Sequence, residues 1–237
     1  MATSRELFEA GRLNDAIDAV GAELRNNPTD AHRRTFLFEM LCFAGNWDRA
    51  DKQLDILAGQ DKDKRLGALL YRAALSAERT RHEMFQKPLP ETGSAPVAPA
   101  GRLNGREFES IEDSDPRIGA RLEVLAGDNY MWIPLAHLAL VEMEPPKRLR
   151  DLLWAPATIH TGAAFQGSDL GEVLLPVLSP YSYGHADPAV RLGRMTVWEE
   201  SPGGGEIPFG QKMFLVDGEE VPLLEVRKLE FRQPAAG

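Results

Sequence analysis

The chain contains little of what disulfide bonding, metal binding or membrane insertion requires. Its 237 residues include one cysteine, Cys42, which excludes an internal disulfide and any metal site built from several cysteines. This scarcity is typical of proteins that mature in a reducing compartment. No run approaches the roughly 18 apolar residues that identify a membrane-spanning helix, and the first residues carry no apolar signal core. We therefore expect a cytoplasmic protein.

Basic residues are also fewer than acidic ones. The sequence has 27 Lys+Arg against 36 Asp+Glu, which gives a formal net charge of -9. A field of this sign repels phosphate backbones and anionic lipid headgroups, so nucleic acid and membrane surfaces are poor partners. Residues 1–85 are nearly neutral, with 13 Lys+Arg against 14 Asp+Glu. The acidic surplus therefore lies in the later part of the chain.

Sequence signatures of common enzymes are missing as well. The sequence has neither a Gly-x-Ser-x-Gly nucleophile motif nor a phosphate-binding loop, and its five histidines lack the spacing of metal ligands. We therefore predict a non-enzymatic protein without catalytic residues, cofactor or metal. The alternative is a small hydrolase or ligand-binding domain. Its site would gather His160, Tyr181, Tyr183 and His185, from segments rich in tyrosine and glycine.

An internal repeat dominates the first part of the chain. Residues 7–16 align with residues 41–50 at an offset of 34, which pairs Gly11 with Gly45. This offset is the period of the tetratricopeptide repeat (TPR), a helix-turn-helix unit that buries its apolar face only by stacking on a neighbour. Two repeats are fewer than the three or so that stability usually requires. We therefore expect this module to pack against the domain that follows.

Helical periodicity defines the elements of this module. It predicts helices at residues 4–10, 15–26, 30–43, 47–58 and 64–85. Asn14 is the expected N-cap of the second helix, because its side-chain oxygen can accept an unpaired backbone N–H. The last helix is expected to act as a cap that packs its apolar stripe against the preceding repeat. That stripe consists of Leu66, Leu69, Leu70, Ala73, Ala74 and Ala77.

The composition changes at residue 86. Residues 86–105 are rich in proline and glycine, which predicts an exposed linker between a module at 1–85 and a domain at 106–237. We expect the domain to begin with a broken helix, whose second part starts at Asp115-Pro116 and reaches about residue 126.

Short strand-like segments follow residue 129. Most are bounded by Pro, Gly or Asp turns, and Asp217-Gly218 is typical of a tight hairpin turn. The predicted fold class is therefore α+β, with an N-terminal TPR-like α-helical repeat module followed by a mostly antiparallel β domain.

Aromatic and arginine side chains are the candidates for contact with a partner. Tryptophan and arginine dominate the hot spots of protein interfaces, and several of them stand beside prolines in this sequence. Each has an alternative role, since the aromatic rings also suit a core and the arginines can pair with the domain's own carboxylates. The candidates are Phe36, Phe43, Trp47, Trp132, Arg148, Arg150 and Trp154.

Several longer motifs resemble the ImpE/SciE/TagJ family. They extend over Trp132-Ile-Pro134 and residues 144–156, 172–178, 187–195 and 210–225, together with 36–47 in the repeat region. The resemblance covers nearly the whole chain. The linker and the acidic segment at 107–115 carry no matching motif.

The resemblance implies an accessory protein of a bacterial type VI secretion system. Family members are similar in binding the small sheath subunit through its N-terminal helix, and they are linked to the AAA+ ATPase that disassembles the contracted sheath. The family offers no established catalytic residues to transfer to this chain. We expect the partner's amphipathic helix on the concave repeat face or at the junction with the sheet domain, while the acidic domain steers basic surfaces of the partner.

Overall fold

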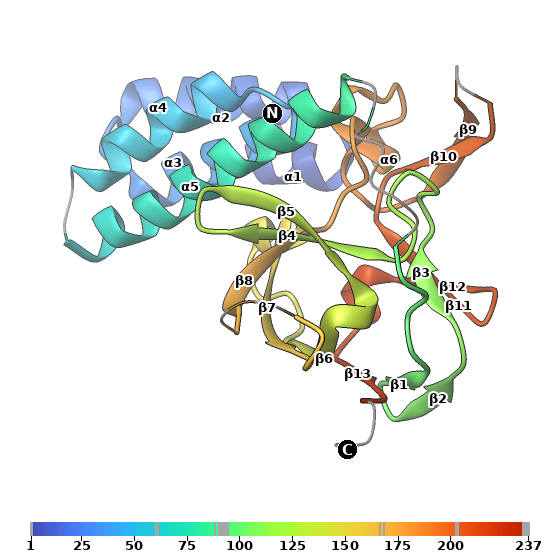
Figure 1. The fold of residues 1–237 in the computed structure, drawn as a ribbon. Helices are drawn as coiled ribbons and strands as arrows, with labels where there is room; N and C mark the ends of the chain where they lie inside the picture. The colour runs from blue at the N-terminus through green and yellow to red at the C-terminus, as the bar shows by residue number, and fades with distance from the viewer. Residues whose placement is uncertain are drawn as a thin grey trace.

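A helical layer from the first part of the chain covers one face of a sheet from the second part (Figure 1). The structure is a computed structural model that describes residues 2–59, 62–87, 89, 95–165, 167, 169–201 and 204–233, apart from the side chains of 62–64. The fold is therefore α+β, as predicted. Residues 88 and 90–94 of the predicted linker lie outside the described residues.

The helical layer follows the predicted positions within two residues. Its helices are α1 (Ser4–Glu9), α2 (Leu13–Asn26), α3 (Ala31–Phe43), α4 (Trp47–Ala58) and α5 (Lys62–Phe85). Helix α1 starts with a capping box, in which Thr3 and Glu6 each accept the other residue's backbone N–H. No described helix combines the length and the apolarity that a membrane crossing needs.

The predicted N-cap of the second helix is wrong. Helix α2 already begins at Leu13, and its cap residue Arg12 makes no side-chain capping bond. The turn at Gly11, whose φ is 79°, brings the chain into the helix earlier than Asn14 would allow. Burial of the Leu13 side chain, which is 2% exposed, stabilises this earlier start.

The second part of the fold is built from antiparallel strands. The large sheet has eight strands in the order β2-β1-β13-β6-β7-β8-β4-β5, and the described residues also form a sheet β12-β11-β3 and a ribbon β10-β9. The strands are β1 (Gly101–Leu103), β2 (Arg106–Phe108), β3 (Ile111–Asp113), β4 (Arg121–Ala126), β5 (Asn129–Pro134), β6 (Leu138–Met143), β7 (Trp154–Thr161), β8 (Gly171–Pro176), β9 (Val197–Glu200), β10 (Glu206–Phe209), β11 (Met213–Val216), β12 (Glu219–Pro222) and β13 (Lys228–Phe231). The short helical turns are η1 (Leu135–His137), η2 (Leu149–Leu152), η3 (Ser182–Gly184), α6 (Pro188–Arg191) and η4 (Leu223–Glu225).

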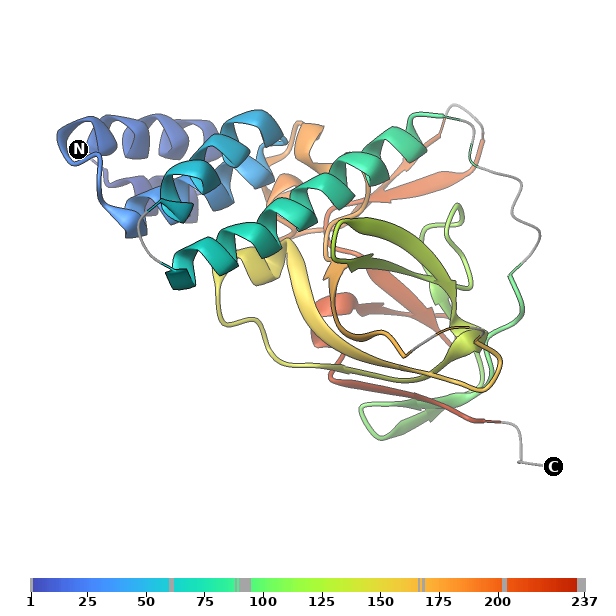
Figure 2. The same cartoon turned by 60° about the vertical axis from the view of Figure 1, so that its left-hand side comes forward.

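The large sheet packs on a different core at each face. One face packs on a cluster that includes Val124 and Ile159, both fully buried. The other face meets the helices through Leu125 and Leu174, which belong to the same cluster as Phe38 of α3. Helices α1, α3 and α5 lie on the sheet-facing side of the helical layer (Figure 1), and α5 runs obliquely over the strands (Figure 2).

The predicted broken helix is wrong in both of its parts, because residues 106–108 and 111–113 form β2 and β3 and residues 121–126 form β4. Burial on both faces explains why β4 was not predicted. Leu122 to Leu125 are all buried, so the alternation of apolar and polar residues that marks a half-buried strand is absent. Strand β1 starts at Gly101, within the range assigned to the linker.

The two equivalent glycines of the repeat lie against the segment that carries η3 and α6. Gly11 and Gly45 have φ angles of 79° and 68°, a region that glycine enters without strain. A Cβ atom on Gly11 would lie 3.4 Å from Pro188, and one on Gly45 would lie 2.4 Å from the ring of Tyr183. One segment of the sheet half therefore closes the tips of both helical hairpins.

This packing predicts that Gly45→Ala destabilises the protein by roughly 1–3 kcal/mol. The new methyl group would overlap the Tyr183 ring, and the backbone would hold a non-glycine residue in the left-handed region. Gly21→Ala is the control, because Gly21 lies within α2 with nothing within 4 Å of an added Cβ. Alanine favours a helix by about 1 kcal/mol over glycine, so this variant should gain stability. Urea unfolding measures both, and a Gly45→Ala protein as stable as the parent would contradict the close approach.

Candidate partner-binding surface

The helical layer and the sheet meet around a buried arginine. Arg81 of α5 is 1% exposed, and its guanidinium pairs in parallel with the Glu123 carboxylate of β4, at 2.7 Å (Nε to Oε1) and 3.0 Å (Nη2 to Oε2). It also donates to Glu78 at 2.9 Å and to the carbonyl of Leu178 at 2.9 Å. A bidentate pair of this kind fixes the relative orientation of the two side chains and also adds to the strength of the interaction. Helix α5 is therefore held on β4 in one register.

Glu123 is the most highly bonded carboxylate at this junction. Lys212 Nζ lies 2.5 Å from Glu123 Oε2 and 2.5 Å from Asp113 Oδ2, and the Tyr130 hydroxyl donates to Glu123 at 2.6 Å. Burial raises the pKa of Glu123, but the charges of Arg81 and Lys212 outweigh it and hold that pKa well below its usual range. For Asp113 burial dominates and raises the pKa to about 6.

We call this group the buried charge cluster. Its members are Glu78, Arg81, Asp113, Glu123 and Lys212, each at most 6% exposed. It joins α5, β3, β4 and the residue before β11. Removing one charge would leave its partner unpaired inside the protein, which costs several kcal/mol.

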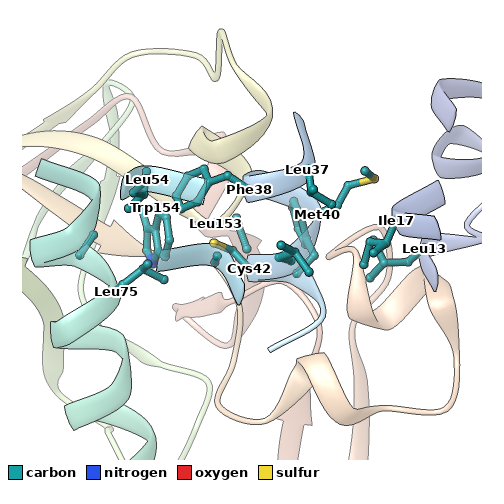
Figure 3. Packing of buried hydrophobic residues seen from close by; sticks show 14 of the residues in the cluster. Leu13, Ile17, Leu37, Phe38, Met40, Cys42, Leu54, Leu75, Leu153 and Trp154 are labelled. Atoms are coloured by element: carbon teal, nitrogen blue, oxygen red, sulfur yellow. The ribbon is translucent and has the colours of Figure 1, made fainter. Parts of the chain in front are cut away.

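A tryptophan forms the second contact between the two halves. Trp154 is 2% exposed, and its ring lies 6.4 Å from that of Phe38 in α3 and 6.2 Å from that of Tyr71 in α5. Its indole N–H donates to Glu78 at 3.1 Å. Figure 3 shows the ring among buried side chains that include Cys42. Burial raises the pKa of the Cys42 thiol well above its usual range, which keeps it unreactive.

Three of the seven candidate contact residues, Phe43, Arg150 and Trp154, contribute to the interior of this junction. Phe43 and Trp154 are 1% and 2% exposed. Arg150 of η2 donates to Glu39 of α3 at 3.0 Å and to the Tyr71 hydroxyl at 2.7 Å. The chain's own η2 and Trp154 therefore fill the sheet-facing side of α3, where one of the two expected positions for a partner helix lies.

The other four candidates are at least partly accessible. Phe36, Trp47 and Trp132 are half-buried, and Arg148 is exposed. Trp47 stacks on His82 with ring centroids 5.6 Å apart. These side chains are spread over different elements, and the structure does not gather them into one surface.

The four residues of the alternative site do not form a single site. Tyr181, Tyr183 and His185 line one cleft of about 440 Å³, but His160 is not among its lining residues. Both ring nitrogens of His185 are engaged, since Nδ1 accepts a backbone N–H at 3.0 Å and Nε2 lies 2.9 Å from Glu199. This imidazole bridges two segments and is not left free to act as a general base.

A groove opens between α5 and the ends of strands β6, β7 and β8. Its volume is about 740 Å³, with Leu70 and Tyr71 on one wall and residues of β6, β7 and β8 on the other. Leu66, Leu69 and Leu70 are 72%, 55% and 49% exposed. The prediction that these leucines pack against the preceding repeat is therefore wrong.

The exposed leucines continue a stripe that is buried farther along α5. Residues three or four apart share a helix face, and this face carries Leu66, Leu70, Ala74, Ala77 and Arg81. Ala74 and Ala77 are buried at 1% and 0% exposure. Leu66 and Leu70 lie on the same face but are exposed, and the first turns of α5 project past the strands (Figure 2). Within the described part of the chain, this apolar surface has no cover.

The opposite wall of the groove is acidic. Glu142, Thr158 and Glu172 are cross-strand neighbours on β6, β7 and β8, so their side chains form a row on one face of the sheet. Glu144 lines the same groove. Arg227 is the one basic residue among the described lining residues, and its guanidinium donates to two backbone carbonyls. The groove thus combines an apolar wall with a negatively charged one.

Comparison with known proteins gives this surface a family context. The family model described as ImpE protein matches residues 105–230. A relative from Pseudomonas aeruginosa, named type VI secretion system accessory component TagJ, is 33% identical over 264 residues, which cover 96% of this chain and 90% of the relative. The chain belongs to the ImpE family. The crystal structure of protein VPA1032 from Vibrio parahaemolyticus shares the fold, with a TM-score of 0.86 at 20% identity over 98% of each chain.

The ImpE match lies on the sheet half of the fold. It includes Glu123, Lys212 and the acidic row, whereas Arg81 and the exposed leucines precede it. The Vibrio structure covers nearly all of the chain. The helical layer is therefore part of the fold that the two proteins share.

The buried charge cluster of this ImpE family member predicts a specific dependence of stability on pH. Burial raises the pKa of Glu78, but Arg81 and His82 outweigh it and lower that pKa from 4.5 to about 2. The folded state then binds fewer protons than the unfolded state between these values. The stability that Glu78 contributes is therefore fully present above about pH 5 and is lost as the pH falls toward 2.

Below about pH 5, the free energy of unfolding of the parent should fall as the pH is lowered. In Glu78→Gln this fall should be smaller, by up to about 1.4 kcal/mol per pH unit. Urea unfolding at several pH values measures this slope. Glu83→Gln alters an exposed carboxylate on the same helix and is expected to keep the parent slope. If Glu78→Gln has the same slope as the parent, Arg81 and His82 do not lower the pKa of Glu78 in the folded state.

Proposed function

We propose that this chain is a non-enzymatic accessory protein of a type VI secretion system. It binds the N-terminal helix of the small sheath subunit and is linked through that contact to the AAA+ ATPase that disassembles the contracted sheath. The named role of the Pseudomonas relative supports the assignment to this apparatus. The role is that of an adaptor in the cytoplasm that holds other proteins.

The observation that carries the proposal is the uncovered stripe of α5 beside an acidic sheet wall. An amphipathic helix has an apolar face with side chains at i, i+3, i+4 and i+7, and such a face suits the exposed Leu66, Leu69 and Leu70. Basic residues on the flank of that helix would meet Glu142 and Glu172. The bound helix would then take the place next to α5 that the sheet leaves empty.

We further propose that α1 to α5 form a TPR-like stack of two repeats and a capping helix. The 34-residue offset supports this, as do the matching conformations of Gly11 and Gly45. In this view the module at 1–85, the linker at 86–105 and the domain at 106–237 are the units of the chain. Burial of the sheet-facing side of the stack then explains why two repeats suffice.

The groove is tested by the double variant Leu66→Ser/Leu70→Ser. Each buried leucine contributes about 1.5–3 kcal/mol on transfer from water, so the double variant should bind a peptide of the sheath subunit's N-terminal helix at least tenfold more weakly. Fluorescence anisotropy with a labelled peptide measures the dissociation constant. The fold should be unaffected, because both side chains are exposed.

Val97→Ser is the matched control for this experiment. Val97 is 87% exposed and lies outside α5, so the variant loses an exposed apolar side chain without touching the groove. Its affinity should equal that of the parent. If the double leucine variant binds the peptide as tightly as the parent does, the helix binds elsewhere on the protein. If the parent itself does not bind the peptide, the small sheath subunit is not the partner.

A further inference from the structure

A second cleft lies at the far end of the molecule from the groove. The ribbon β9-β10 and the start of α5 stand at opposite sides of the fold (Figure 1). The cleft has a volume of about 440 Å³ between the ribbon and the η3 segment. Its lining side chains include Tyr181, Tyr183, His185, Glu199 and Phe209, and no lysine or arginine is among the described lining residues.

The aromatic walls of this cleft are fixed in place. Tyr181 has a φ of 66°, an uncommon conformation for a bulky residue. Its hydroxyl donates to the carbonyl of His82 at 3.1 Å, which ties it to the last turn of α5. The Tyr183 ring lies 5.8 Å from that of Trp47, and the Phe209 ring lies 5.8 Å from that of His185. Because these rings are already held in place, binding a flat ligand costs little conformational entropy for ordering them.

The cleft also holds a carboxylate, that of Glu199, whose position His185 fixes. The backbone N–H of Asp187 donates to His185 Nδ1 at 3.0 Å, so the imidazole hydrogen resides on Nε2 and points to Glu199 Oε1 at 2.9 Å. The imidazole therefore orients the Glu199 carboxylate through a hydrogen bond. The Glu199 side chain is 52% exposed, and among the described residues no lysine or arginine pairs with it.

We propose that this cleft binds the guanidinium group of an arginine side chain from a partner protein. A guanidinium is planar, stacks on aromatic rings and pairs with carboxylates, which are the two kinds of group that the cleft presents. Glu200 on the same ribbon adds negative charge that attracts a basic segment. The site is separate from the groove and stands whether or not a sheath helix binds there. It would give the protein a second point of attachment.

The test uses the tripeptide acetyl-Gly-Arg-Gly-amide and its counterpart with citrulline, which has the same shape without the charge. Amide chemical shifts of the full-length protein are followed by NMR during titration. The arginine peptide should shift resonances of residues 181–185 and 197–209 with a dissociation constant of about 1–10 mM. The citrulline peptide should produce no saturable shift. Equal responses to the two peptides would overturn the proposal.

Two variants localise the interaction. Glu199→Gln keeps the shape and the contact to His185 but removes the charge, so affinity for the arginine peptide should fall about tenfold. Glu206→Gln is the matched control, because Glu206 lies on the neighbouring strand opposite Glu200 and outside the lining of the cleft. Its affinity should stay within about twofold of the parent. Equal losses in both variants would mean diffuse attraction to an acidic ribbon and would refute a specific site.

Discussion

The buried pairing of Arg81 with Glu123 is the interaction on which the rest of this structure depends. Neither charge could remain inside the protein alone, because an unpaired buried ion costs several kcal/mol. Their parallel hydrogen bonds require α5 to lie on β4 in one register. Lys212 and Tyr130 complete the bonding of Glu123, so β5 and the residue that precedes the hairpin β11-β12 join the same arrangement. The helical layer and the sheet are therefore held together by a specific polar contact as well as by apolar packing.

That register determines where a partner can bind. Arg81 fixes the second half of α5 on the sheet, while Leu66 and Leu70 in the first half stay exposed. The acidic row of Glu142 and Glu172 faces this stripe from strands whose own positions the sheet core fixes. A preformed groove of this kind loses little conformational entropy on binding. With the aromatic cleft at the other end, the molecule has two separated surfaces, which agrees with the adaptor role proposed for it.

Local signals in the sequence were sufficient for the helices and for the hairpin at Asp217-Gly218, where both residues have positive φ. They failed for β4, because a strand buried on both faces has no alternating pattern.

Local signals in the sequence also failed for the candidate site. Trp154 and Arg150 have the chemistry of interface residues, yet they bind the chain's own α3 and α5. Arg81 and Glu123 are 42 residues apart in the sequence, and no local pattern indicates such a pair. The exposure of Leu66 depends on where the sheet ends, which is likewise a tertiary property.

The proposed function requires α5 to receive a helix of the sheath subunit beside the ends of β6, β7 and β8. Hydrogen–deuterium exchange of the full chain, with and without the N-terminal peptide of that subunit, tests it most directly. The account predicts slower exchange in residues 65–72, 142–145 and 171–174 on peptide binding, with no change around Arg81, which is already buried. Protection confined to other parts of the molecule, or faster exchange along the junction between α5 and β4, would contradict it.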